Sequence, residues 1–124
     1  NYGVVEKLRA LGIEVKLMVV WTSGDPDVAE HMVFMYTLNA KKRGWFDEVT
    51  LVVWGPSAAL LARDEELRRQ MKEIQHEGVT VEACLRCAEN YGVVEKLRAL
   101  GIEVKLMGVP LSDYLKEDRR VLTF

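Results

Sequence analysis

Short, nearly continuous apolar runs alternate along the chain with longer segments whose apolar residues recur at helical spacing. Such runs are typical of β-strands that are buried on both faces, and turn-forming Gly, Pro, Ser or Asp residues follow most of them. The predicted strands cover residues 15–22, 49–54, 79–83, 102–107 and 121–124. The predicted helices cover residues 28–43, 58–77 with an interruption near Asp64, 90–100 and 112–116.

This alternation leaves little room for β-hairpins and predicts a parallel sheet, because parallel strands are joined by helical crossovers. The expected fold class is α/β: a three-layer α/β/α sandwich around a mainly parallel five-stranded sheet, Rossmann-like in its general plan. The order of the strands does not follow from the sequence.

The first eighteen residues, NYGVVEKLRALGIEVKLM, occur again without change at residues 90–107. The second copy supplies a helix and a strand of the alternating pattern, whereas the first copy runs directly into the strand at 15–22. A strand that continues end-on into another cannot lie beside it, because a parallel pairing needs a crossover of about a dozen residues or more. We therefore expect residues 1–18 to be a duplicated helix–strand extension, with residues 15–18 beginning the first strand, and residues 19–124 to form a single domain.

The extension would place Val4, Val5, Leu8 and Leu11 on one face of a helix, and such a face favours apolar cover. We expect it to dock on a neighbouring subunit or to exchange with the matching helix there; a loosely ordered tail is the alternative. The two copies are identical even at the charged positions expected at the surface. A natural duplication, an engineered one and an artefact are all compatible with this identity.

Composition and charge narrow the classes of function. With 124 residues, 49% hydrophobic and 29% charged, the chain has the composition of one globular domain. The formal charge of −2 and the lack of a basic stripe argue against a nucleic-acid partner. No apolar run reaches membrane-spanning length and no signal-peptide pattern is visible, so we expect no membrane partner. Two cysteines do not make a disulfide framework, and a reducing cytoplasm is the expected location.

The expected strand ends direct attention to four connecting segments. In open α/β sheets, ligands bind beyond the carboxyl ends of the strands, where glycines allow close backbone approach and helix starts offer free amides to an anion. Tight turns also need such residues for purely local reasons, and this alternative has at least equal weight. The ligand-binding candidates at these ends are Ser23, Gly24, Asp25, Gly55, Pro56, Ser57, Arg86 and Gly108.

Cys84 and Cys87 form a C-x-x-C motif, which can be half a zinc site, a redox dithiol or a coincidence. A zinc site is not expected, because His31 and His76 would fall at opposite edges of the sheet. A thioredoxin-like pair normally follows the first strand of its unit, whereas this pair follows the third. Cys84 is the candidate nucleophile, because a helix start and Arg86 beside it favour a thiolate. A small, buried hydrophobic residue is the alternative for either cysteine, and the one favoured for Cys87.

Three pieces of residues 19–124 carry a resemblance to a known family. They are the WTSGD turn at 21–25, the VWGPS turn at 53–57, and the seven residues that separate Cys84 from Gly92. The chain resembles the DsrE family of small sulfur-relay-type proteins, in its single-domain branch. The resemblance implies a three-layer α/β/α fold and assembly into homotrimers or homohexamers. Trp21 and Trp54, at the ends of the first two strands, either wall the pocket or belong to a subunit interface, and the interface is favoured because aromatic residues concentrate in assembly contacts.

The resemblance also implies a chemistry. In family members that carry a persulfide, the sulfur-accepting cysteine stands at the position of Cys84, with Cys87 as an additional cysteine of some branches. Cys84 and Cys87 are therefore the catalytic candidates, with Cys87 either a resolving thiol or a packed neighbour. The function expected from this resemblance is a persulfide carrier, sulfurtransferase-like at most, which exchanges sulfur with donor and acceptor proteins and needs no cofactor and no metal. The alternative is a non-catalytic oligomeric protein that binds a small ligand.

Overall fold

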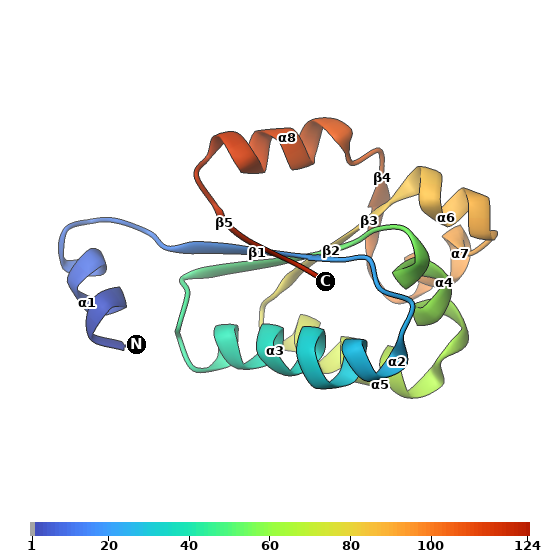
Figure 1. Ribbon diagram of the computed structural model, residues 1–124, viewed down its shortest axis with the longest axis horizontal. Helices are drawn as coiled ribbons and strands as arrows, with labels where there is room; N and C mark the ends of the chain where they lie inside the picture. Colours follow the sequence, from blue (N-terminus) through green and yellow to red (C-terminus); the bar gives the residue numbers. More distant parts are fainter. Residues whose placement is uncertain (1) are drawn as a thin grey trace.

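The computed structural model describes residues 2–124 and, for residue 2, the backbone (Figure 1). Its elements in chain order are α1 (Tyr2–Ala10), β1 (Lys16–Trp21), α2 (Pro26–Val28), the π-helix η1 (Ala29–Phe34), α3 (Met35–Lys42), β2 (Glu48–Val53), α4 (Pro56–Arg63), α5 (Glu65–His76), β3 (Thr80–Cys84), α6 (Leu85–Tyr91), α7 (Val94–Ala99), β4 (Glu103–Lys105), α8 (Gly108–Lys116) and β5 (Arg120–Thr123).

The five strands form one sheet in the order β4-β3-β2-β1-β5, and every neighbouring pair is parallel. The chain builds the sheet outward from β1 to β4. It then crosses back over one face through α8 and adds β5 on the free side of β1 (Figure 1). The α/β class and the parallel five-stranded sheet are thus confirmed.

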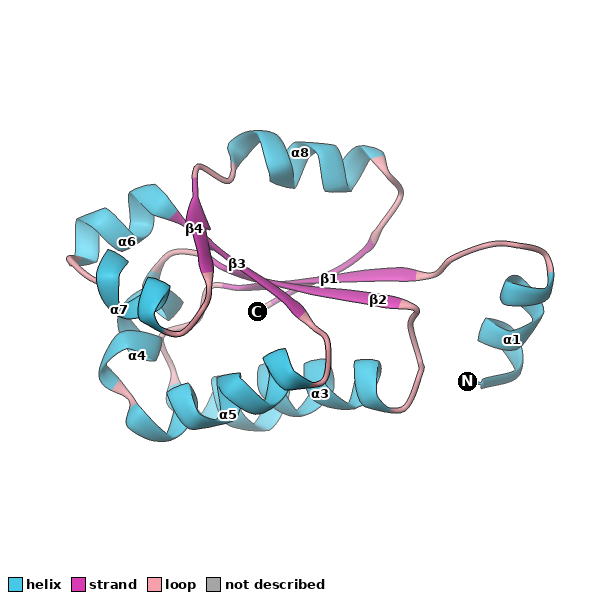
Figure 2. Ribbon diagram, turned by 180° about the vertical axis from the view of Figure 1, so that it is seen from behind, coloured by secondary structure: helices cyan, strands magenta, loops and turns pink. Residues whose placement is uncertain are grey.

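Helices cover both faces of the sheet. α8 lies over one face, and α3 and α5 run beneath the other, as the two opposite views show (Figures 1 and 2). The larger core lies on the side of α3 and α5 and includes Leu51, Leu61 and Ile74. A smaller cluster lies under α8 and joins Met18 to Val52 and other buried side chains. Because side chains alternate along each strand, β1, β2 and β3 contribute residues to both cores.

Two helix starts follow directly from the sequence. Asp25 precedes Pro26, the first residue of α2, and its carboxylate accepts a hydrogen bond from the Asp27 amide at 2.8 Å. Asp64 separates α4 from α5, as predicted, and accepts one from the Leu67 amide at 3.0 Å. Each cap satisfies an amide that the first helical turn leaves without a backbone partner.

The segment after β3 differs from the prediction. Residues 84–90 were expected as a loop before one helix at 90–100, but α6 begins at Leu85, directly after Cys84. Gly92 then takes a left-handed conformation with φ 69°, which ends α6 before α7 begins at Val94. A residue without a side chain beyond Cα adopts this conformation at little cost, so the glycine sets the break. The helix expected at 112–116 is also longer, because α8 begins at Gly108.

The N-terminal extension forms α1, which stands at one end of the molecule, beyond the amino end of β1 (Figure 1). The Arg9 guanidinium forms an ion pair with Asp47 and donates to the Gly44 carbonyl at 3.2 Å. The Val15 amide donates to the Asp47 carboxylate at 2.8 Å. That hydrogen bond is the main cause that lowers the pKa of Asp47. The extension is therefore attached to its own chain at the segment before β2, and β1 begins at Lys16.

Candidate functional site

Cys84 is both the last residue of β3 and the N-cap of α6. Its extended backbone, with φ −69° and ψ 116°, turns the chain from strand to helix. Its Sγ accepts a hydrogen bond from the Cys87 amide at a distance of 3.4 Å. The two cysteines therefore lie together at the carboxyl edge of the sheet, because Cys84 is the N-cap of α6 and Cys87 follows it within the first helical turn.

The exposure of the two cysteines is the reverse of the expectation, which had Cys84 as the accessible nucleophile and Cys87 as the buried residue. Cys84 is 6% exposed, whereas Cys87 is only partly buried. The reason is the pleat of β3, which points the Cys84 side chain to the face that α8 covers. Its neighbours in that cluster are Met18, Val52 and Met107.

The thiol of Cys87 faces both Cys84 and the loop after β2. Burial is the main cause that raises the pKa of Cys87, and the neighbouring Cys84 thiol adds to it. A hydrogen bond from the Gly55 amide acts in the opposite direction and favours the Cys87 thiolate. Gly55 has φ 68°, in the region that favours glycine, and this conformation sets the turn that presents its amide to the cysteine pair.

The loops after β1 and β2 also meet at this edge. A side chain on Gly24 would lie 3.3 Å from Pro56 Cβ, so these two loops are in close contact. Ser57 is fully buried, and its hydroxyl donates to the Trp21 carbonyl at 2.5 Å. The Ser57 hydroxyl therefore holds the ends of β1 and β2 together. Ser23 accepts from the amide of Asp25, the residue that caps α2.

Two further ligand candidates make contacts within their own helices. The side chain of Arg86 is 75% exposed and its guanidinium lies 3.9 Å from Glu89 in an ion pair. Gly108 opens α8 at an exposed position, and its carbonyl accepts from the Ser112 hydroxyl at 2.7 Å. The structure thus groups Cys84, Cys87 and the Gly55 amide, while Arg86 points toward its own helix.

The two tryptophans at the strand ends have different environments. Trp21 is fully buried and its ring meets Phe34 edge-on, with centroids 5.0 Å apart. An interface role for Trp21 is therefore wrong, since its ring fills the larger core. Trp54 is partly buried and packs on the cluster that holds Cys84.

Sequence reasoning overlooked a buried carboxylate beside the cysteines. Glu82 is 3% exposed and lies two residues before Cys84, on the same face of β3. Its carboxylate accepts from the Tyr114 hydroxyl at 2.5 Å and pairs with Lys105 Nζ at 2.5 Å. Lys105 is also the register partner of Cys84 on β4. A glutamate in the middle of the apolar strand TVEAC was the signal that could have found this cluster.

These contacts bind α8 to the sheet. Burial, followed by the hydrogen bond to Glu82, raises the pKa of Tyr114 to about 12, so this hydroxyl stays a donor at neutral pH. Arg119 lies over the Tyr114 ring, 4.3 Å from its centroid, and donates to Glu48 at 3.0 Å. The C-terminal part of the α8 crossover is thereby fixed to the sheet.

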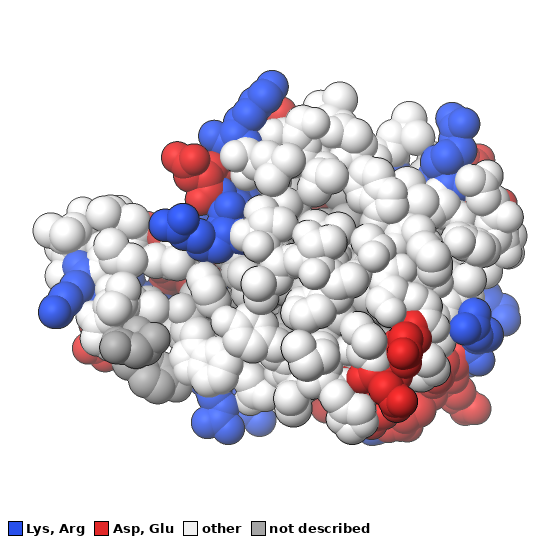
Figure 3. Space-filling model, in the orientation of Figure 1, with Lys and Arg blue, Asp and Glu red and all other residues white. Residues whose placement is uncertain are grey.

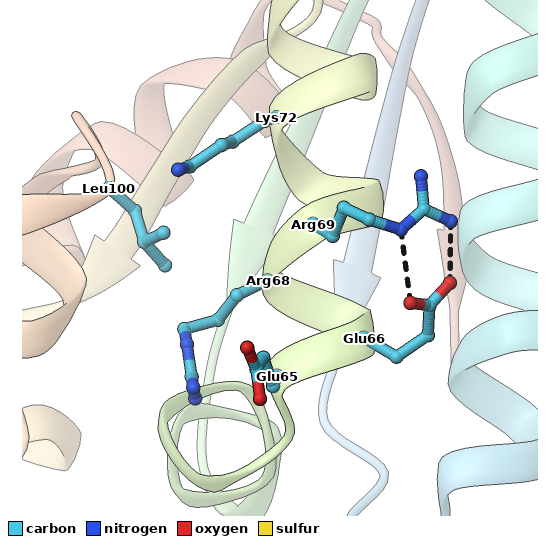
Figure 4. A pocket seen from close by; sticks show the side chains of 6 residues that line it. All are labelled: Glu65, Glu66, Arg68, Arg69, Lys72 and Leu100. Carbon is cyan, nitrogen blue, oxygen red and sulfur yellow. Dashed lines mark hydrogen bonds and ion pairs between the residues drawn. The ribbon is translucent and has the colours of Figure 1, made fainter.

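A hollow of about 630 Å³ lies along α5, and neither cysteine lines it. Glu66 and Arg69, which line it, are paired with each other in a two-pronged contact (Figure 4). That contact is the main cause that lowers the pKa of Glu66 to about 2. The hollow is a charged surface groove whose lining residues include no thiol, so its size does not make it the better candidate for sulfur chemistry.

The chain matches the DsrE/DsrF-like family over residues 15–124. It is similar to the solved structure of BT1422, a conserved protein of unknown function from Bacteroides thetaiotaomicron, with 39% identity and a TM-score of 0.85. That match covers 88% of this chain and 94% of the other. The ychN protein of E. coli is 13% identical with a TM-score of 0.68, covers 90% of this chain and all of its own, and shares the fold. No curated protein matches the chain.

Among residues 2–124, no helix combines the length and the apolar character needed to cross a membrane.

The matched region begins at Val15, just before β1, and contains the whole sheet together with both cysteines. It covers far more than half of the 124 residues. The chain belongs to the DsrE/DsrF-like family.

Proposed function

We propose that this protein accepts sulfane sulfur on Cys84 as a persulfide and passes the sulfur on. The observation that carries the proposal is the grouping of Cys84, Cys87 and the Gly55 amide at the carboxyl edge of the sheet. Membership of the DsrE/DsrF-like family supports the same function.

The chemistry requires one nucleophilic sulfur and a donor with a sulfur–sulfur bond. The Cys84 thiolate attacks the outer sulfur of a donor persulfide, a new sulfur–sulfur bond forms, and the donor leaves as a thiolate. The Cys87 amide, 3.4 Å from Cys84 Sγ, donates to the sulfur that carries the negative charge. A hydrogen bond to the charged form favours that form, so the amide supports the reactive thiolate.

Other groups at this edge would act on the bound sulfur or its donor. Backbone amides at Gly24 and Gly55 lie in two loops that touch each other, where a small anionic donor group would bind. Ser23, Asp25, Pro56, Ser57 and Gly108 would shape this edge, and Arg86 would attract an anionic donor from solvent.

The proposal includes partners. We propose assembly into homotrimers or homohexamers, with separate proteins as sulfur donor and acceptor. The centre of the face shown in Figure 3, over β5 and between α8 and α3, carries few charged side chains. Val121 and Leu122 of β5 are each 38% exposed, which supports burial of this edge between subunits.

Intact-mass measurement after treatment with sodium polysulfide tests the role of Cys84. We expect C87S to gain the mass of one sulfur atom, and C84S to gain none. A reducing agent should remove the added sulfur from C87S. Unmodified protein in both variants, with circular dichroism equal to that of the wild type, would contradict the proposal.

A second candidate function is supported by the 6% exposure of Cys84. A buried cysteine behaves as a small hydrophobic residue, and the protein would then be a non-catalytic oligomer that binds a small ligand at the strand ends. The same mass measurement separates the two candidates, because a binding protein would gain no sulfur.

A further inference from the structure

The surroundings of Cys84 restrict how a sulfur bound there can leave. Its Sγ lies among Met18, Val52 and Met107 and under α8, which contributes Leu111 to the same cluster. The Cys84 side chain is 6% exposed, so an incoming thiol meets the outer sulfur of a Cys84 persulfide before it meets Sγ. A group that attacks Sγ itself is best placed if it already belongs to the chain.

Cys87 is such a group. It packs on the cluster that holds Cys84, and its thiol interacts directly with the Cys84 thiol. Cys84 is the N-cap of α6 and Cys87 is the third helical residue after it. Side chains at the N-cap and at this third position lie next to each other in the capping-box arrangement, which suits the short Cβ–Cβ distance of a disulfide.

We propose that Cys87 is a resolving cysteine that attacks Cys84 Sγ after Cys84 has become a persulfide, so that sulfur leaves as sulfide. This inference rests on the proposed function, because it requires the Cys84 persulfide as its substrate. It assigns the protein a further activity, the reduction of sulfane sulfur to sulfide, with an external dithiol as the reductant for repeated turnover.

The step balances in atoms and electrons. The Cys87 thiolate forms a bond to Cys84 Sγ, and the bond between Cys84 Sγ and the outer sulfur breaks. The outer sulfur takes the electron pair of that bond and the proton of Cys87, and leaves as hydrogen sulfide. The two cysteines are oxidised to a disulfide while the sulfane sulfur is reduced. A dithiol then reduces the disulfide and is itself oxidised to a disulfide.

The contacts of Cys87 set the order of events. Its burial and the adjacent Cys84 raise the pKa of Cys87, which favours the thiol form of Cys87 before Cys84 has accepted sulfur. The Gly55 amide faces the sulfur of Cys87 and favours its thiolate for the second step. Attack of Cys87 on Cys84 Sγ is also favoured because both groups lie within one helical turn, which gives a high effective concentration.

The test uses the full chain, sodium polysulfide as donor and a dithiol such as dithiothreitol in a separate second step. The first step leaves a shorter polysulfide or sulfide in both proteins, so we expect the wild type to release one equivalent of sulfide per chain more than C87S and to lose the mass of two hydrogen atoms. C87S should retain the mass of one added sulfur and release that sulfur as sulfide only when the dithiol is added. Because the chain has only these two cysteines, no other residue can replace Cys87 in the disulfide.

Each alternative outcome has one meaning. A wild type that keeps the added sulfur and forms no disulfide would overturn the resolving role of Cys87 while leaving the carrier function intact. Absence of added sulfur from both the wild type and C87S would overturn the proposed function itself. Added sulfur on Cys87 in C84S, with sulfide release unchanged, would also overturn the assignment. Near-ultraviolet and far-ultraviolet circular dichroism of C84S and C87S serve as the control for folding.

An independent measurement keeps the inference testable if C87S folds poorly. Equilibration of the wild type with oxidised and reduced glutathione should convert the pair to a disulfide, read as a loss of two titratable thiols without a glutathione adduct in the intact mass. A pair that stays fully reduced in a large excess of oxidised glutathione would contradict the inference, because the disulfide that the second step forms would then not be a stable product.

Discussion

Residues 1–18 and 90–107 have the same sequence but different structures. In the first copy, Tyr2–Ala10 is one continuous helix, whereas in the second the corresponding residues are divided between α6 and α7 by Gly92. Gly12 and Gly101 have similar left-handed conformations, with φ 76° and 81°. The sequence therefore specifies the end of the helical segment in both copies, but not its continuity.

Burial separates the copies further. Ile13 is 47% exposed, whereas its counterpart Ile102 is 3% exposed in the larger core. At the other end the relation is reversed, because Leu17 is 1% exposed within β1 and Leu106 is 62% exposed after β4. Neither difference comes from the side chains themselves. It comes from the neighbours: Leu17 lies on β1 inside the sheet and Leu106 follows the edge strand β4, whereas Ile102 packs in the larger core and Ile13 does not.

The largest expected effect of this difference concerns the matched leucines of the two helices. Leu97 is fully buried, and L97A should lower the free energy of unfolding by about 2–5 kcal/mol through loss of buried surface and a residual cavity. L8A removes the same atoms from a partly exposed site on α1, so the loss should be below ~1 kcal/mol. Urea unfolding of L97A and L8A measures the two losses of stability. Equal losses would show that α1 is packed as tightly as α7.

The matched lysines should give the next largest effect. Lys105 neutralises Glu82, whose side chain is 4% exposed, whereas Lys16 lies 3.6 Å from Glu48, whose side chain is 40% exposed. We expect K105M to cost about 1–3 kcal/mol, since it leaves a buried carboxylate with one partner fewer. K16M should cost less than ~1 kcal/mol because water solvates Glu48.

Combination of K105M with E82Q serves as the control for the buried pair. The double variant should recover part of the stability lost in K105M, because an amide carries no charge that needs neutralisation. No recovery in urea unfolding would locate the role of Lys105 outside the Glu82 contact.

The matched glycines should respond with opposite signs. G92A places a side chain at φ 69° and should cost about 1–2 kcal/mol of stability. G3A lies within α1, where alanine is the better helix former, and should increase helicity with a gain of up to ~1 kcal/mol. Far-ultraviolet circular dichroism and thermal unfolding report both changes. Two effects of the same sign would contradict the different backbones of the two copies.

The smallest expected effect is a pH dependence of the local stability around Val15, which lies in the first copy. The hydrogen bond from the Val15 amide, aided by Arg9, lowers the pKa of Asp47 from its ordinary value of 3.8. A lowered pKa in the folded protein gives stability above the ordinary value, and this stability is lost as the pH falls below it. The protection factors of the amides near Val15, which correct for the intrinsic pH dependence of exchange, should therefore decrease below about pH 4, the ordinary Asp range.

D47N provides the control for this pH dependence, since an amide has no such titration. The variant should show lower protection factors near Val15 at neutral pH and no further decrease of these factors in acid. The second copy has no equivalent link, because Arg98 pairs with Glu95 on its own helix at 3.5 Å. Exchange at Val104 should accordingly be insensitive to D47N.

Much of the fold was predictable because it depends on local sequence patterns. The apolar runs predicted the five strands, and the cap at Asp64 predicted the break between α4 and α5. The C-x-x-C spacing also predicted that Cys84 and Cys87 lie together. Capping, turn conformation and the alternation of side chains act over a few residues, so the sequence contains them directly.

Other features depend on which segments become neighbours, and only the tertiary structure decided these. The order of the strands, the burial of Cys84 under α8 and the pairing of Glu82 with Tyr114 and Lys105 all join residues far apart along the chain. The two identical copies make the distinction clear: the sequence determined that each contains a helix and ends at a glycine, whereas packing determined which leucine and which isoleucine is buried. The physical reason is that burial depends on the surrounding side chains and not on the residue that is buried.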